Sequence, residues 1–139
     1  MNDKKILGDS GEHYALSMLG FAGLLCSKLP DNWKYYDLIV QRSNVLERIS
    51  VKTRSESASF GKSSWFLFET TGKYEWVIFI VKFRSGEIRS WCIPLDVAIK
   101  HSTARDAESK NPNQRTISWG KLEEAPLNRY LDNWLLERF

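Results

Sequence analysis

The sequence predicts a single α/β domain in which helices pack on a mixed β-sheet, and three observations lead to this fold class. The chain has 139 residues, the usual size of one domain with one hydrophobic core. Hydrophobic residues make up 42% of it and charged residues 27%, which is the balance of a soluble globular protein. Apolar residues recur with helical and strand periods in the order helix, three strands, loop, two strands, helix, short strand, helix. We therefore treat residues 1–139 as one domain.

The first half of the chain is expected to form a helix followed by three strands. Residues 9–22 carry apolar side chains at steps of three and four residues and end at glycines. Residues 24–29 are short, apolar and followed by a turn sequence. Residues 35–42 and 45–54 are two further strands, and the tight-turn dipeptide Ser43-Asn44 between them predicts a β-hairpin.

The second half is expected to add strands and helices to the same sheet. Residues 65–70 follow a polar loop and fit either a short strand or a helical turn. Residues 75–83 are the most apolar run, which predicts a central strand that forms a hairpin with residues 87–93. The remaining expected elements are a helix over 95–101 opened by Pro94, a polar connection over 102–114, a short strand over 115–119, and a helix from Pro126 with Leu127, Tyr130, Leu131, Trp134 and Leu135 on one face.

Composition limits the compartment and the class of partner. Cys26 and Cys92 lie in apolar runs without zinc-ligand spacing, which indicates buried thiols of a reducing compartment. The longest apolar run, 76–81, is too short to span a bilayer, so we expect a cytoplasmic protein without a membrane partner. The net charge of +3 does not by itself establish a polyanionic partner. The tryptophans are expected in the core, with base stacking by one of them as the lesser alternative.

A carboxylate and an ammonium group are expected to converge on one face of the hairpin. Asp37 interrupts an apolar strand, and Lys52 lies on the next strand, on the same face as Ser50. A turn at 43–44 places Asp37 opposite Ser50, with Lys52 one diagonal step away. Phosphodiester hydrolysis needs this grouping, because a carboxylate holds Mg²⁺ while a lysine orients or deprotonates the attacking water. The alternative for Asp37 is a plain ion pair with Lys52.

Other charged residues have two interpretations each. Glu12 lies three residues after Asp9, which favours a helix-capping box at least as much as a metal ligand. Arg54 and Lys62 are candidates for contacts with DNA phosphates, although a solvated surface explains them equally well.

These motifs resemble those of the PD-(D/E)xK nuclease superfamily. They are Gly8-Asp-Ser-Gly-Glu12, Tyr36-Asp37-Leu-Ile-Val and Arg48-Ile-Ser50-Val-Lys52-Thr. The pattern is most similar to archaeal Holliday-junction resolvases and to small homing or repair endonucleases. The resemblance implies a restriction-endonuclease-like mixed sheet with an αβββαβ core flanked by helices. It also implies that Glu12 and Asp37 organise Mg²⁺ or Mn²⁺ and that Lys52 is catalytic.

The chain departs from the family pattern at Ser50. The family carries an acid two residues before the lysine, whereas this chain reads Ser-Val-Lys. A hydroxyl is a poor substitute for a carboxylate on Mg²⁺. Either the site is weakened, or a carboxylate comes from a later element, as in some type II restriction enzymes. Glu69 and Glu56 are the downstream candidates, and we favour Glu69 because it ends a structured segment.

The sequence thus leads to one functional hypothesis and two alternatives. The hypothesis is a metal-dependent DNA endonuclease with Glu12, Asp37, Lys52 and Glu69 as catalytic residues and DNA as its partner. The first alternative is a catalytically weakened pseudo-nuclease that acts as a DNA-binding module. The second is a protein-interaction protein that keeps the fold. A homodimer formed through the final aromatic helix is a further expectation.

Overall fold

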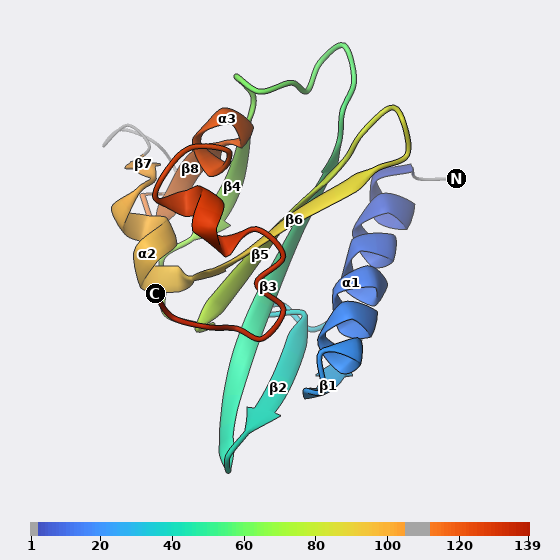
Figure 1. Cartoon of the computed structure of the whole chain (residues 1–139), viewed down its shortest axis with the longest axis vertical. Helices are drawn as coiled ribbons and strands as arrows, with labels where there is room; N and C mark the ends of the chain where they lie inside the picture. Colours follow the sequence, from blue (N-terminus) through green and yellow to red (C-terminus); the bar gives the residue numbers. More distant parts are fainter. Residues whose placement is uncertain (1–2, 105–111) are drawn as a thin grey trace.

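The computed structural model describes residues 3–104 and 112–139, and it confirms the mixed α/β fold class (Figure 1). A five-stranded sheet has the order β1-β2-β3-β5-β6, and a three-stranded sheet has the order β4-β8-β7. The elements are α1 (Asp3–Phe21), β1 (Leu25–Lys28), β2 (Leu38–Arg42), β3 (Val45–Ser55), β4 (Trp65–Glu69), β5 (Trp76–Lys82), β6 (Ile88–Pro94), α2 (Leu95–Lys100), β7 (Thr103–Ala104), β8 (Gln114–Ser118), α3 (Trp119–Leu122) and the 3-10 turn η1 (Leu127–Tyr130).

The β2–β3 hairpin has the register that its turn predicts. Ser43 and Asn44 both have positive φ, at 46° and 69°, which is the geometry that a two-residue hairpin turn requires. Leu38 faces Ile49, and the antiparallel ladder continues without a slip to the turn. The ladder ends one pair short of Asp37, although the Asp37 N–H still donates to the Ile49 carbonyl.

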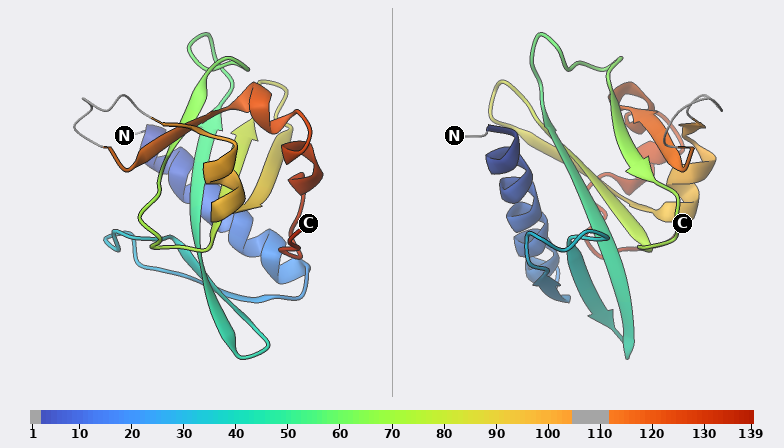
Figure 2. Two further views of the ribbon diagram at one scale, coloured as in Figure 1. Left: turned by 90° about the vertical axis from the view of Figure 1, so that its left-hand side faces the viewer. Right: turned by 180° about the vertical axis from the view of Figure 1, so that it is seen from behind.

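Two hydrophobic layers cover the two faces of the main sheet. Helix α1 packs on one face, while β4, β8, α2 and α3 cover the other (Figure 2). Strand β5 runs parallel to β3 and antiparallel to β6, and its residues Trp76 to Val81 are all buried. A strand covered on both faces needs a continuous apolar run rather than an alternating one, which is what the sequence predicted for this segment.

Helix α1 approaches β3 most closely at Gly11. A Cβ atom at this position would lie 1.8 Å from Thr53 Oγ1, 2.8 Å from its Cβ and 3.0 Å from its Cγ2. Because threonine is branched at Cβ and stiff, Thr53 cannot make room by a small rotation. Gly11 therefore sets the distance between helix and sheet, and it does so immediately before Glu12.

Gly11→Ala is expected to destabilise the protein by about 3 kcal/mol, because the added methyl group overpacks the contact with Thr53. Urea unfolding followed by circular dichroism measures this change. Gly8→Ala is the matched control: Gly8 lies in the same helix with no heavy atom within 4 Å of its added Cβ. That variant should gain about 0.5–1 kcal/mol from helix propensity. Equal stability of the two variants would contradict the role of Gly11.

The predicted final helix is wrong. The chain forms only η1 after Pro126 and then continues without helix, with positive φ at Asp132 and Leu136. The side chain of Asn133 replaces helical hydrogen bonds, because it donates to the carbonyls of Cys92 and Glu137 and accepts from the Glu137 N–H. The dimer interface that the aromatic helix suggested therefore has no helix to form it.

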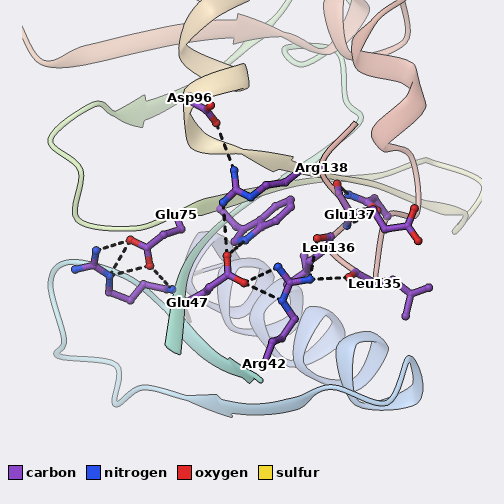
Figure 3. Close-up of polar contacts among 11 residues, drawn as sticks. Arg42, Glu47, Glu75, Asp96, Leu135, Leu136, Glu137 and Arg138 are labelled. Carbon is purple, nitrogen blue, oxygen red and sulfur yellow. Dashed lines mark hydrogen bonds and ion pairs between the residues drawn. The ribbon is translucent and has the colours of Figure 1, made fainter. Parts of the chain in front are cut away.

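A buried ionic cluster holds this C-terminal segment against the hairpin (Figure 3). Arg42 donates to the carbonyls of Leu135 at 3.1 Å and Leu136 at 2.9 Å. Its Nε also donates to Glu47 at 2.8 Å, and Glu47 accepts from the indole N–H of Trp76 at 2.7 Å. Since Glu47 is only 8% exposed, these partners are what makes its burial tolerable. The cluster explains why tertiary contacts override the helical periodicity of the segment.

Smaller differences concern the ends of elements. Residues 65–69 are a strand, which decides the alternative left open by the sequence. Strand β7 and helix α3 were not predicted, and part of the polar connection over 102–114 lies outside the described residues. Cys26 and Cys92 are free thiols, as expected. Within residues 3–104 and 112–139, the helices are too short or too polar to cross a bilayer.

Candidate active site

Asp37 is held between β1 and β3, just before β2 begins. Its N–H donates to the Ile49 carbonyl, and its carbonyl accepts from the Leu29 N–H, both at 2.9 Å. Its carboxylate accepts from the backbone N–H of Val51 at 2.7 Å, so the side chain of Asp37 satisfies a backbone donor of β3. Burial raises the pKa of Asp37, and the Val51 N–H, Lys52 and Lys28 only partly oppose this effect.

Glu12 lies in the middle of α1, not at its N-terminus. The helix begins at Asp3, and Asp9 forms an ion pair with Lys5 at 2.9 Å within the helix. The capping box expected from Asp9 and Glu12 is therefore wrong. Burial raises the pKa of Glu12, and the negative charge of Asp37 raises it further. Glu12 and Asp37 line the same cavity of about 220 Å³.

Lys28 is a residue of this site that the sequence analysis missed. Its ammonium lies 3.4 Å from the Glu12 carboxylate and 2.8 Å from that of Asp31. The Lys28 side chain is 15% exposed and that of Glu12 is 19% exposed, whereas that of Asp31 is 60% exposed. Strand pairing places Lys28 opposite Leu38, the residue after Asp37. Correct pairing of β1 with β2 would have identified it, but the short apolar run around β1 does not specify a register.

Lys52 lies on the face of β3 that points away from α1. Its charge lowers the pKa of Asp37, so the two side chains are within electrostatic reach. Lys52 lines a second cavity of about 290 Å³, between β3 and β4, together with Arg54 and Trp65. The carboxylate pair and the lysine therefore line two different cavities, and the effect of Lys52 on the pKa of Asp37 is what connects them.

Tyr74 connects Ser50 to the end of β4, and sequence reasoning did not find it. Its hydroxyl donates to the Glu69 carbonyl at 2.8 Å, accepts from the Glu69 N–H at 3.0 Å and hydrogen-bonds to Ser50. Burial, with the charges of Glu69 and Asp37, raises the pKa of Tyr74 to about 12. The phenol therefore stays neutral and fixes Glu69 on the Ser50 side of the site.

The two candidates for a relocated acid have different surroundings. The Glu69 carboxylate accepts a long hydrogen bond of 3.4 Å from Gln114 and lies near Tyr74. Glu56 follows the far end of β3, where its carboxylate accepts from the Arg84 N–H at 3.0 Å. Glu56 thus caps the turn between β5 and β6. Glu69 is therefore the better placed of the two to supply the acid missing at Ser50.

Of the two candidate phosphate contacts, Arg54 lines the same cavity as Lys52, and Lys62 lies in the loop between β3 and β4. The exposed Arg54 guanidinium stacks over the Phe60 ring at 4.4 Å. Lys62 is exposed, and its carbonyl accepts from the Gly120 N–H at 2.8 Å, which fixes its loop to α3.

The carboxylate pair has the chemistry of a partial magnesium site. Among residues 3–104 and 112–139, no three His, Cys, Asp or Glu side chains converge in a metal-ligand cluster. Glu12 and Asp37 nevertheless repel each other in a partly desolvated cavity, and a divalent cation between them would relieve that repulsion. Mg²⁺ keeps several waters and is commonly held by one or two carboxylates with substrate phosphates. The two side chains present therefore fit the ion.

Glu12→Gln is expected to raise the free energy of unfolding at pH 7 in the absence of metal. The raised pKa of Glu12 means that the fold disfavours its ionised form. The ionised Glu12 carboxylate therefore destabilises the fold. This destabilisation is absent well below pH 4.5, the ordinary pKa of a glutamate, and it grows as the pH rises through and above that value. Urea unfolding with EDTA at pH 4 and pH 7 measures the difference, with Glu124→Gln as an exposed change of the same charge. A stability gain that is equal at both pH values would contradict the assignment.

Solved structures that are similar to this chain include two nucleases. One is the bacterial homing endonuclease I-Ssp6803I, with a TM-score of 0.61 and 15% identity over 97% of this chain and 93% of that chain. The other is Hjc, a Holliday junction resolvase from the archaeal hyperthermophile Archaeoglobus fulgidus, with a TM-score of 0.50 and 13% identity over 82% and 85% of the two chains. No protein-family profile matches the sequence, and no curated protein sequence matches it. Both similar structures are restriction-endonuclease-like nucleases, so the predicted fold is confirmed.

Proposed function

We propose that the protein is a metal-dependent DNA endonuclease that hydrolyses phosphodiester bonds with Mg²⁺ or Mn²⁺. The observation that carries this proposal is the Glu12–Asp37 carboxylate pair, which shares a cavity and lies within electrostatic reach of Lys52. The fold adds support, because the similar structures include a homing endonuclease and a Holliday junction resolvase. Carboxylates that carry raised pKa values beside a lysine are characteristic of catalytic sites.

In this mechanism each side chain has one task. Glu12 and Asp37 would hold the divalent ion, and a bound ion would supply positive charge near the scissile phosphate and lower the pKa of a water molecule. The Val51 N–H keeps the Asp37 carboxylate in position. Lys52 orients the attacking water and offsets the charge that builds up on the phosphate. Glu69 takes the place of the acid missing at Ser50, and Tyr74 holds its backbone.

A catalytically weakened pseudo-nuclease is the second candidate, and one observation favours it. Lys28 already places a cation 3.4 Å from Glu12, where the metal-dependent mechanism needs the divalent ion. Ser50 is 4% exposed and hydrogen-bonded to Tyr74, so it offers no carboxylate. In such a protein the cavity would be neutralised by lysine, and the fold would bind DNA without cleaving it.

A calorimetric titration with Mn²⁺, run beside a plasmid-nicking assay, tests the proposal. Asp37→Asn should weaken Mn²⁺ binding by at least about tenfold, because half of the carboxylate pair is lost. Asp96→Asn is the control, since Asp96 is 81% exposed on α2. Mn²⁺ binding by the wild type without nicking would favour the pseudo-nuclease. Unchanged affinity in Asp37→Asn would remove the metal site from this cavity.

A further inference from the structure

Trp65 is an exposed tryptophan on β4, the outer strand of the second sheet. Phe66 and Phe68 point inwards and contact the Phe79 ring, with centroid distances of 5.1 and 5.7 Å. Trp65 alternates with them and is 57% exposed. Leaving an indole in water forgoes the stabilisation that its burial provides. An indole placed this way on a well-packed strand is available to a ligand.

Trp65 separates two cavities that both carry positive charge. On one side it lines the cavity between β3 and β4, with Lys52 and Arg54. On the other side it lines a cavity of about 420 Å³ that contains Lys100, Lys121 and His101, with the hydroxyls of Ser102, Thr103, Thr116 and Ser118. Among the described residues that line these cavities, no Asp or Glu occurs. Both cavities therefore suit anions.

The base of this surface is firmly held. Trp119 is buried and stacks on Phe60 at a centroid distance of 6.1 Å. The backbone N–H of Trp119 donates to the carbonyl of Ser64 at 3.0 Å, and Ser64 directly precedes Trp65. The neighbouring hydrogen bond from Gly120 to Lys62 brings the Lys62 loop to the same helix as Lys121. The indole and its flanking cations are thus set on a rigid support.

The combination of an exposed indole and cations on two sides selects a nucleic acid over a protein partner. Protein contacts centred on tryptophan are enclosed by apolar neighbours, whereas the lining here is dominated by hydroxyls and ammonium groups. Aromatic platforms within positive grooves bind single strands, because every base has a face to stack while the cations hold its phosphates. A base inside a duplex is already stacked on its neighbours, so it offers no free face.

We propose that Trp65 is a stacking platform for an unpaired base of the DNA substrate, with Arg54 on one side and Lys100 and Lys121 on the other binding phosphates. This inference rests on the proposed function and deepens it by naming the substrate class. Because Trp65 and Lys52 line one cavity, the unpaired segment lies beside the cleaved bond. The substrate is DNA in which a single strand meets a duplex.

Fluorescence anisotropy in EDTA, which prevents cleavage, compares a duplex with a single-stranded tail against the same duplex with blunt ends. Trp65→Ala should weaken binding to the tailed duplex by about 5- to 100-fold, the range for loss of one stacked base. Binding to the blunt duplex should change by less than about twofold on the same reasoning. Trp65→Phe keeps an aromatic face and should retain most of the affinity. Phe21→Ala is the control, because Phe21 is 87% exposed on α1.

A second variant keeps the test independent of the indole. Replacing both Lys100 and Lys121 by alanine should make binding to the tailed duplex less dependent on salt. The slope of log K against log salt concentration should become about 1.4 less negative, which corresponds to two phosphates of a single strand. Equal losses on tailed and blunt DNA in Trp65→Ala, or no loss on either, would overturn the stacking proposal alone. Failure of the wild-type protein to bind any DNA would overturn the proposed function together with it.

Discussion

Lys52→Ala is expected to lower the rate of DNA cleavage by about three orders of magnitude, within the range for loss of a proton-transfer group or a charge-stabilising group. The structure supports this choice because the charge of Lys52 lowers the pKa of Asp37 and its side chain lines a cavity between β3 and β4. Single-turnover nicking of supercoiled plasmid with Mg²⁺ and with Mn²⁺ measures the rate. The thermal melting of the variant should match that of the wild type, because the side chain reaches into an open cavity.

Lys82→Ala provides the matched control for this experiment. Lys82 is the exposed last residue of β5, and it pairs with Ser55, three pairs further along the parallel β3–β5 ladder than Lys52. Its substitution removes the same charge without touching the candidate site, so nicking should be retained. If Lys52→Ala kept more than a tenth of the wild-type rate, Lys52 would be a structural partner of Asp37 rather than a catalytic residue.

The parts of the fold that the sequence predicted are those with strong local signals. Ser43 and Asn44 adopt positive φ, so the hairpin turn fixed the register of β2 and β3. The continuous apolar run of β5 identified a strand buried on both faces. In both cases residues close in sequence determine the geometry, and no distant partner is needed.

The parts that the sequence did not predict depend on contacts between distant residues. The C-terminal segment has helical periodicity, but Arg42 holds its carbonyls 93 and 94 residues further along the chain. Lys28 reaches Glu12 from β1, and Tyr74 reaches Ser50 from the segment between β4 and β5. Such partners have no periodic pattern in the sequence, since only the assembled sheet brings them together. The first turns of α1 were missed because they begin with three charged residues and contain Gly8, so they continue no apolar period.

Neighbouring residues of one motif, Gly11 and Glu12, contribute to helix packing and to the candidate site respectively. The Gly8-Asp-Ser-Gly-Glu12 motif predicted a metal ligand, yet Gly11 serves the packing of α1 on β3. That close contact brings Glu12 to the same cavity as Asp37. A helix held further away would leave Glu12 in solvent, with no raised pKa. The glycine therefore contributes to the site through distance alone.

Glu69→Gln is expected to reduce cleavage by about two to three orders of magnitude if Glu69 replaces the acid missing at Ser50. The substitution keeps a side-chain oxygen that can accept from Gln114, and the backbone contacts of residue 69 with Tyr74 do not involve the side chain. The variant should therefore fold normally and lose only the negative charge. Single-turnover nicking measures the rate, and Mn²⁺ calorimetry shows whether affinity falls with it.

Glu56→Gln separates a role in catalysis from the general loss of a carboxylate. Its oxygen can still accept from the Arg84 N–H, so the turn between β5 and β6 stays capped and nicking should change by less than about threefold, as for a surface substitution. Equal losses in the two variants would mean that Glu69 acts only through stability or net charge. Full activity of Glu69→Gln would instead mean that Glu12 and Asp37 hold the metal ion without a third carboxylate, which Mg²⁺ permits when substrate phosphate and water complete its shell.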